Sequence, residues 1–395
     1  MDFTRHIDNE LAALSSRGLL RSPRSTEGAQ GTHLTMNGQR VLCLCSNNYL
    51  GLANHPRILA AVREASDRLG YGAGASRHIS GTEATHLRAQ ERVSRYLLQP
   101  AGLLFSTGYA ANVGTLQALV GKGDVIFSDE LNHASLIDGA RLSRARILVY
   151  RHGDYEHLEQ LLRAHRHEGS AALVVTDSVF SMDGDQADLR RLRDLATAFE
   201  AGLVVDEAHA IGLLGPQGRG LCAAQQVVPD VLVAPLGKAF GAAGAISAGA
   251  PNTVRLVENR ARSFVFSTAS PAIQAAAILA ATDLVEAAEE QRATLAARSA
   301  QLHTGLSNLG YKVPEHPSVI LPVHVGPPDL VMDISRELLA RQVFVHGIRP
   351  PTVPPGTSRL RVTTMATHTE ADIQHALGAF SEVRPMLDAA DSVKG

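Results

Sequence analysis

The chain has 395 residues, of which 45% are hydrophobic and 19% are charged, and its formal net charge is −2. This composition is typical of a globular protein with a sizeable core, and it excludes disordered and fibrous chains. The small net charge gives no sign of a nucleic-acid partner or of an acidic membrane partner. Three cysteines, an odd number, argue against a secreted disulfide scaffold.

The N-terminal residues include acidic side chains and contain no apolar stretch, so we expect no signal peptide. We also find no apolar run of about 18 residues, so we expect no membrane span and a cytoplasmic location. Phe3, Ile7, Leu11 and Leu14 recur at helical spacing, which predicts an N-terminal helix. We assign this helix and the arm that follows it to residues 1–45.

Short apolar runs alternate with helical patterns over residues 46–285. The predicted strands are GLLFST, VIFSD, ILVY, ALVVTDS, GLVVD and the run that begins at Val231. This alternation predicts an α/β domain with a mostly parallel central sheet and helices on both of its faces. Alanine-rich helical sequence follows Pro271, and residues 286–395 read as a smaller C-terminal α+β domain.

Ligands of parallel sheets bind at the carboxyl ends of the strands. The candidate residues that follow the predicted strands are Gly108, Tyr109, His133, Ser181, Asp206, His209 and Lys238.

Lys238 follows a short apolar strand and is surrounded by glycine and alanine in LGKAFGAAGA. Small residues leave room for a flat ligand close to the backbone. An apolar pocket favours the neutral amine, which can form a Schiff base with a carbonyl group. The alternative interpretation of so short a motif is a solvated lysine on a surface loop.

Asp206 ends the strand GLVVD, where an unpaired buried charge would be costly. Its carboxylate therefore either caps the next helix or serves a ligand. An aspartate beside a pyridine nitrogen is what a pyridoxal phosphate site needs, because it keeps that nitrogen protonated. His209 follows three residues later and either faces the same cleft or is structural.

Residues 206–209 also spell DEAH, a motif of helicases. A nucleic-acid ATPase additionally needs a phosphate-binding loop, G-x-x-x-x-G-K-[ST], and this chain has none.

Residues 106–112 join a predicted strand to a helix, whose first N–H groups favour a phosphate. His133 stands at a loop-to-helix junction, where it either covers a flat ring or is solvated. No histidine and cysteine residues have the spacing of a metal site, so we expect no metal.

Taken together, the motifs resemble those of the α-oxoamine synthases, pyridoxal-phosphate (PLP) enzymes with an aspartate-aminotransferase-like fold, PLP fold type I. The matching stretches cover about residues 1–385 in the family's order: SNNYLGL, SRHISGT, TGYAANVG, DELNHASLIDG, DSVFSMDGD, VDEAHAIGLLGPQGRG, LGKAFGAAGA, FSTASP and IRPPTVPPGTSRLRVT. The resemblance implies PLP as cofactor, an amino acid and an acyl thioester as substrates, and a homodimer.

The last of these stretches is most similar to members that condense L-alanine with a pimeloyl thioester, carried by coenzyme A or by acyl carrier protein. Other members of the family condense glycine with acetyl- or succinyl-CoA or make secondary-metabolite and signalling amino ketones, and these activities remain alternatives. A non-catalytic binding protein on the same fold is a further alternative, although Lys238 and Asp206 argue against it.

The resemblance implies four residues around the cofactor's ring. Lys238 would hold the cofactor as a Schiff base, and Asp206 would face the pyridine nitrogen. His209 would bond to the phenolic oxygen, and His133 would stack on the ring as a catalytic residue. The further cofactor contacts that the resemblance implies are Gly108 and Tyr109 at the phosphate, and Ser181.

The resemblance also implies residues that bind substrate or reach the partner subunit. Arg349, with Thr352 beside it, would hold a substrate carboxylate. Arg21 matches an N-terminal arginine that binds substrate; alternatively, it caps the last carbonyls of the first helix. Thr268 would reach the phosphate of the partner subunit's cofactor, which requires a homodimer with shared sites.

Two positions depart from the family's pattern. Pro235 stands three residues before the lysine, where a threonine or serine usually touches the phosphate. Proline offers neither a hydroxyl nor an N–H group, so one phosphate contact is lost or moved. Ala272 stands where a second proline is common.

Overall fold

The computed structural model describes residues 2–17 and 19–392. The chain forms two compact units. One unit spans residues 47–295, and the other combines the N-terminal segment up to Ser46 with the C-terminal segment from Ala296. Within the described residues, no helix is long and apolar enough to cross a membrane.

In the described part of the unit 47–295, a seven-stranded sheet has the strand order β3-β9-β8-β7-β6-β4-β5. Its strands are β3 (Ala101–Phe105), β4 (Val125–Asp129), β5 (Arg146–Tyr150), β6 (Ala172–Asp177), β7 (Gly202–Asp206), β8 (Val231–Pro235) and β9 (Ala245–Gly249). Strands β4 to β8 pair in parallel, whereas β9 is antiparallel to both β3 and β8. The predicted α/β class with a mostly parallel sheet is confirmed. The sequence did not predict β9, because AISAG is short and lacks a clear apolar pattern.

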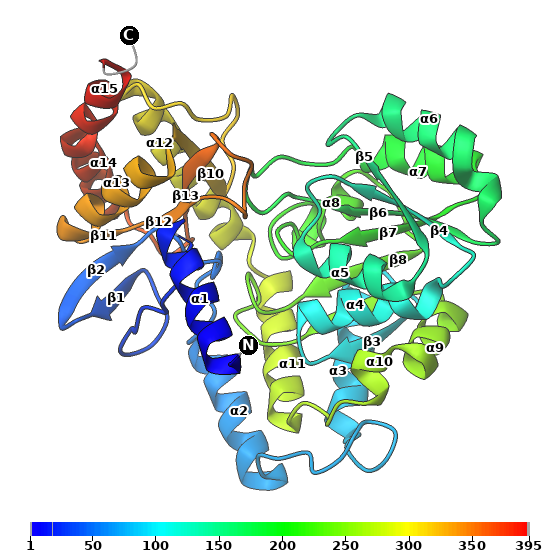
Figure 1. Ribbon diagram of the computed structural model, residues 1–395. Helices are drawn as coiled ribbons and strands as arrows, with labels where there is room; N and C mark the ends of the chain where they lie inside the picture. Colours follow the sequence, from blue (N-terminus) through cyan, green and yellow to red (C-terminus); the bar gives the residue numbers. More distant parts are fainter. Residues whose placement is uncertain (1, 18, 393–395) are drawn as a thin grey trace. The chain divides into compact units, whose positions relative to one another are not determined.

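Helices cover both faces of this sheet (Figure 1). The helices α4 (Gly108–Leu119), α5 (Ala134–Ser143), α9 (Pro251–Arg260) and α10 (Arg262–Val265) share one hydrophobic core with strand residues such as Ile126 and Val204. The helices α3 (Ala84–Tyr96), α6 (Tyr155–His165) and α7 (Leu189–Ala198) pack against strands as well, and α2 (Pro56–Leu69) packs on α11 (Ala272–Glu286). A fully buried leucine or isoleucine in such a core contributes roughly 1.5–3 kcal/mol.

The described part of the other unit contains two small sheets. In one, β13 (Ser358–Thr363) lies between β10 (Ile320–Gly326) and β12 (His346–Ile348); in the other, β2 (Gln39–Cys43) lies between β1 (His33–Met36) and β11 (Val343–Phe344). The helices of this unit are α1 (Phe3–Ser16), most of α12 (Glu289–Asn308), α13 (Pro328–Ala340), α14 (Glu370–Val383) and α15 (Pro385–Ser392). The helix α1 was predicted from its apolar spacing, yet Phe3, Ile7 and Leu11 are exposed.

The alanine-rich stretch after Pro271 is divided into two helices, α11 and α12. Ala287 caps α11 by donating its backbone N–H to the carbonyls of Asp283 and Val285. The buried guanidinium of Arg292 also donates to the Val285 carbonyl at 2.7 Å, which helps to satisfy the end of α11. Side-chain bonds of this kind leave no mark on apolar periodicity, so the pattern alone did not reveal the break.

His152 holds the loop after β6 against the end of β4. Its Nδ1 lies 2.9 Å from Asp129 Oδ1, and its Nε2 lies 2.8 Å from Asp185 Oδ2. Its ring meets the ring of Phe180 edge-on at 4.3 Å. Burial alone would lower the pKa of His152, but the bonds to the two carboxylates outweigh it and raise the pKa to about 10. A charged imidazole therefore ties the loop that carries Ser181 to the sheet.

We predict that His152→Gln lowers stability in a pH-dependent way. The histidine pKa is about 6.5 in an unfolded chain, so the raised folded pKa stabilises the protein fully below that value. The stabilisation is then lost as the pH rises through the folded pKa of about 10. Chemical unfolding near pH 6 should show the variant less stable by roughly 1.5–3 kcal/mol, the usual range for charged hydrogen bonds.

The difference between variant and parent should shrink steadily towards alkaline pH. His167→Gln, which changes an exposed histidine on the neighbouring 3-10 turn, is the matched control and should show no such trend. A loss in His152→Gln that stays constant from acid to alkaline pH would contradict the assignment.

Candidate active site

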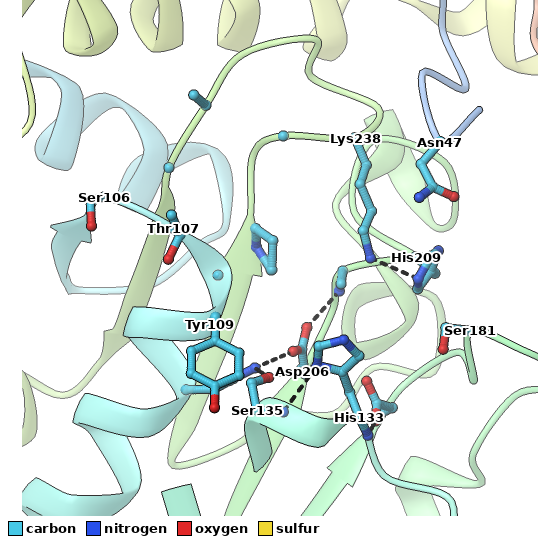
Figure 2. A pocket seen from close by; sticks show the side chains of 18 of the residues that line it. Asn47, Ser106, Thr107, Tyr109, His133, Ser135, Ser181, Asp206, His209 and Lys238 are labelled. Carbon is cyan, nitrogen blue, oxygen red and sulfur yellow. Dashed lines mark hydrogen bonds between the residues drawn. The ribbon is translucent and has the colours of Figure 1, made fainter. Parts of the chain in front are cut away.

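A cavity of about 440 Å³ lies at the carboxyl ends of β6, β7 and β8, beside the starts of α4 and α5 (Figure 2). Its volume is within the usual range of small-molecule sites. Seven residues that the sequence singled out line it: Gly108, Tyr109, His133, Ser181, Asp206, His209 and Lys238. The lining also includes polar residues that the sequence analysis did not select: Asn47, Ser106, Thr107, Asn112, Ser135 and Asp177.

Lys238 lies in the loop between β8 and β9. The loop closes on itself, since Leu236 N–H donates to the Gly244 carbonyl and Gly241 N–H to the Lys238 carbonyl. Gly241 has φ +61°, and a Cβ there would stand 2.3 Å from the backbone of Leu52, so only glycine fits. The amine of Lys238 lies 2.7 Å from Nε2 of His209 (Figure 2).

Asp206 ends β7 and is only 3% exposed. Its Oδ2 accepts a hydrogen bond from Asn112 Nδ2 at 2.6 Å, and its Oδ1 accepts one from the Ala208 N–H at 2.8 Å. The bond to Ala208 is a local cap of the next turn, so the carboxylate both holds its own loop and lines the cavity. A polar asparagine among the small and apolar residues of TGYAANVG is the signal in the sequence that could have pointed to Asn112.

His133 is held by three contacts with two residues, Asp177 and Ser135, at the start of α5. Its backbone N–H donates to Asp177 Oδ2 at 2.6 Å, and its Nδ1 lies 2.7 Å from Ser135 Oγ. The backbone N–H of Ser135 also donates to Nδ1, so the proton of the neutral ring is on Nε2. Burial lowers the pKa of His133, with Lys238 lowering it further and Asp206 raising it. The ring is therefore neutral near pH 7 and suited to stacking.

Asp177 stands opposite Asp206 in the parallel register of β6 and β7. Burial and the negative charge of Asp206 hold the pKa of Asp177 well above its usual range. The carboxyl-end rule applied to ALVVTD would have found Asp177, but the sequence analysis selected Ser181 from this segment.

The start of α4 forms one end of the cavity. Thr107 caps the helix by accepting a hydrogen bond from the Ala110 N–H at 3.1 Å. A Cβ at Gly108 would come within 2.8 Å of the Pro235 ring, so the backbone is bare there. Tyr109 is half exposed and donates its hydroxyl to Asp138 at 2.6 Å. The free N–H groups of this helix start suit a phosphate.

The cavity fits pyridoxal phosphate in its donor set. It combines a lysine amine for the aldehyde, a buried carboxylate for the ring nitrogen, and a helix N-terminus with a bare glycine for the phosphate. Asn112 Oδ1 is buried beside Asp206 and has no hydrogen-bond partner among the described residues, so it can accept a bond from a ligand.

Glu207, the second residue of the DEAH stretch, has a structural role. Glu207 is fully buried and accepts hydrogen bonds from the N–H groups of Leu221 and Cys222 at 2.9 and 2.7 Å. It thereby caps the short helix α8 (Leu221–Ala224).

Thr268 is not one of the described residues that line this cavity. It is exposed, and its backbone bridges to Ser76. The neighbouring Ala269 N–H donates to the Ala75 carbonyl, so the two segments run side by side.

Arg21, Arg349 and Thr352 belong to the other unit, where they line a separate cavity of about 710 Å³ together with Arg24 and His346. The guanidinium of Arg21 donates to Thr352 Oγ1 at 3.2 Å. The alternative in which Arg21 caps the first helix is wrong, because Arg21 points to Thr352.

Arg17, not Arg21, donates to the Ala13 carbonyl at the end of α1. The two arginines lie close in sequence, and the pairing of Arg21 with a residue 331 positions away is invisible to local pattern.

A family model, curated relatives and solved structures all indicate the same protein family. The family model for aminotransferase class I and II matches residues 39–380. The 8-amino-7-oxononanoate synthase of Geobacter sulfurreducens is 47% identical over 384 residues, covering 96% of this chain and 98% of the relative. That of Geotalea daltonii is 46% identical over 379 residues, covering 95% and 96%.

A solved structure of serine palmitoyltransferase, SPT with a PLP internal aldimine, is 30% identical and has a TM-score of 0.91. The match covers 97% of this chain and 98% of that chain. The predicted aspartate-aminotransferase-like fold, PLP fold type I, is confirmed by this likeness. The chain belongs to the aminotransferase class I and II family and, within it, to the α-oxoamine synthases.

Proposed function

We propose that the chain catalyses the PLP-dependent condensation of L-alanine with a pimeloyl thioester, with loss of CO₂, to give 8-amino-7-oxononanoate for biotin biosynthesis. The observation that carries the proposal is identity of 43–47% over nearly the whole chain to 8-amino-7-oxononanoate synthases. Identity to serine palmitoyltransferase is lower, at 30%. The products are the amino ketone, CO₂ and the free thiol of the carrier.

The residues of the cavity have the chemistry that this reaction needs. When bound, PLP supplies an electron sink for the pair of electrons left on the amino acid's Cα. Lys238 would hold the cofactor and then, as a free amine, take the proton from Cα. Asp206 would keep a proton on the ring nitrogen, and the neutral His133 ring would cover one face.

Around this centre, His209 would donate to the phenolic oxygen and Ser181 would bond nearby. Gly108 and Tyr109 would flank the phosphate, with the N–H groups at the start of α4 as its donors.

Two arginines would bind the substrate carboxylates. A guanidinium fork matches a carboxylate, so Arg349, with Thr352 beside it, suits the amino acid. The distal carboxylate of pimeloyl needs a second cation, for which Arg21 is the candidate. Support comes from the cavity of about 710 Å³, which Arg21, Arg349 and Thr352 all line.

The site would be completed by a second copy of the chain. Thr268 is exposed, and so are large apolar side chains on its own segment and on the segment of its bridge partner Ser76: Phe266 at 71%, Ile79 at 80% and Tyr71 at 73%. Apolar side chains gathered on an exposed surface mark an interaction site. We therefore propose a homodimer in which Thr268 reaches the partner subunit's cofactor phosphate. We also propose a cytoplasmic location, where acyl carrier protein and coenzyme A carry such thioesters.

The direct test is a panel of amino acids against acyl thioesters, scored for released thiol. We expect the highest kcat/KM for L-alanine with pimeloyl thioester, on coenzyme A or on acyl carrier protein. Faster turnover with glycine and acetyl- or succinyl-CoA, or with L-serine and palmitoyl-CoA, would overturn the substrate assignment.

Lys238→Ala should lower turnover by at least roughly 100-fold, since it removes the base. Lys122→Ala, on an exposed turn, is the matched control and should leave turnover unchanged.

Arg21→Ala should selectively weaken the use of pimeloyl thioester. A charge-assisted hydrogen bond is worth about 1.5–3 kcal/mol, so kcat/KM should fall roughly ten- to a hundredfold. An uncharged acyl thioester of similar length should be almost unaffected. Arg17→Ala, which removes the helix cap, is the matched control and should spare both donors. Equal losses on both donors would refute a carboxylate role for Arg21.

Subunit complementation tests the shared site. Mixing Lys238→Ala chains with Thr268→Ala chains creates, in each mixed dimer, one site with both residues intact. After verified subunit exchange, activity should recover to about one quarter of the parent, since half of the dimers are mixed and each has one intact site. Mixing Lys238→Ala with Asp206→Asn is the control, because both residues line one chain's cavity and no intact site forms. No recovery in the first mixture would count against sharing.

A further inference from the structure

Tyr49 is a buried residue that the proposed reaction has not used. It lies in the stretch SNNYLGL and is 0% exposed. Its hydroxyl oxygen is 2.7 Å from Nδ1 of His209 and donates to Asn47 Oδ1 at 3.1 Å. Its ring meets the His209 ring edge-on at a centroid distance of 6.0 Å.

His209 therefore has a hydrogen-bonding group at each ring nitrogen. Nδ1 faces the Tyr49 hydroxyl and Nε2 faces the Lys238 amine, both at 2.7 Å. His209 is only 4% exposed, so little water competes for these contacts. The state of the imidazole is set by which of its two neighbours donates and which accepts.

Counting protons decides between the two tautomers. A tyrosine hydroxyl has one proton, and the carbonyl oxygen of an asparagine can only accept. Because Tyr49 donates to Asn47, its oxygen must accept a proton from Nδ1–H of His209. Nε2 is then the unprotonated nitrogen, and it accepts from Lys238. With this tautomer each of the three contacts has one donor and one acceptor: Lys238 donates to His209, His209 donates to Tyr49, and Tyr49 donates to Asn47.

We propose that Tyr49 is a positioning residue that holds His209 as the Nδ1–H tautomer, so that Nε2 can take a proton from Lys238. In that transfer an N–H bond at Nζ breaks and an N–H bond at Nε2 forms, leaving a neutral amine and an imidazolium. The imidazolium keeps its Nδ1–H on the Tyr49 oxygen, and its new Nε2–H points back at the neutral Lys238 amine.

This transfer matters because only a neutral amine attacks a carbonyl group. The proposal rests on the role of Lys238 in the proposed function and adds where its proton goes. It also gives His209 the Nε2–H that a bond to a phenolic oxygen would need. In the opposite tautomer, Nε2 of His209 would already carry a proton and could not accept one from Lys238.

The first test reads the tautomer directly, by nitrogen NMR of the cofactor-free full chain with labelled histidine. The signal of His209 among the 17 histidines is assigned with His209→Gln. The parent should show a protonated Nδ1 and an unprotonated Nε2. In Tyr49→Phe the acceptor is gone, so the ratio of the two tautomers should move at least roughly fivefold towards Nε2–H. An unchanged ratio would overturn the proposal.

A second variant protects the test if Tyr49→Phe fails to fold. Asn47→Ala removes the acceptor of the Tyr49 proton, which then turns to Nδ1 and should also favour Nε2–H. Tyr96→Phe is the matched control: Tyr96 is equally buried, and its hydroxyl donates to the Gly218 carbonyl at 2.6 Å, away from His209. It should leave the tautomer unchanged, and a shift there as large as in Tyr49→Phe would refute a specific role.

The second readout is the rate at which the cofactor-free chain takes up PLP, followed by visible absorbance near neutral pH. Tyr49→Phe should slow uptake roughly five- to tenfold, because less of Lys238 is neutral, and Tyr96→Phe should not. Uptake at the parent's rate would overturn the proton-transfer role. Since neither readout uses an amino acid or a thioester, a failure of the proposed reaction leaves both results interpretable.

Discussion

A carboxylate that is almost fully buried at the end of a strand needs a balancing charge, and in this chain that carboxylate is Asp206. Its two hydrogen-bond donors, the Asn112 amide and the Ala208 N–H, are both neutral. Such bonds orient the group but leave its charge in place. The charge is felt nearby, since it adds to burial in raising the pKa of Asp177 across the sheet register. A protonated ring nitrogen is the partner that would balance it.

The parallel sheet explains how far the sequence alone could lead to this site. Asp206, His209 and Lys238 follow apolar runs, and parallel strands bring such ends to one edge, so their gathering was predictable. Their hydrogen-bond partners were not, because Asn112 lies 94 positions from Asp206 and Tyr49 lies 160 positions from His209. Asn112 is brought close by the helix α4 and Tyr49 by a turn, and no local sequence pattern reveals either contact.

The unit formed by the N-terminal and C-terminal segments shows the same limit of sequence-based prediction. The N-terminal segment joins the C-terminal one through parallel pairing of β2 with β11, where Val343 stands opposite Leu42. No local sequence pattern predicts a two-residue strand such as β11. The border between the compact units falls inside α12, at residues 295 and 296, where the helical pattern is unbroken. The domain boundaries after residues 45 and 285 therefore stay predictions.

Pro235 shows how one departure from the family's pattern is accommodated by its neighbours. It ends β8, where it stands opposite Ala245 of β9, and its ring fills the space beside Gly108. A threonine there would add a hydroxyl, whereas proline adds a rigid apolar wall. The hydroxyls of Ser106 and Thr107 line the same end of the cavity.

Thr107 accepts from Ala110 N–H and so keeps its own proton to donate. A phosphate at the start of α4 would thus lose one donor at Pro235 and still meet hydroxyls and backbone N–H groups on the other side. The glycine is the necessary counterpart of the proline: with Pro235 in place, any side chain at Gly108 would collide with the ring and displace the helix start on which the phosphate depends.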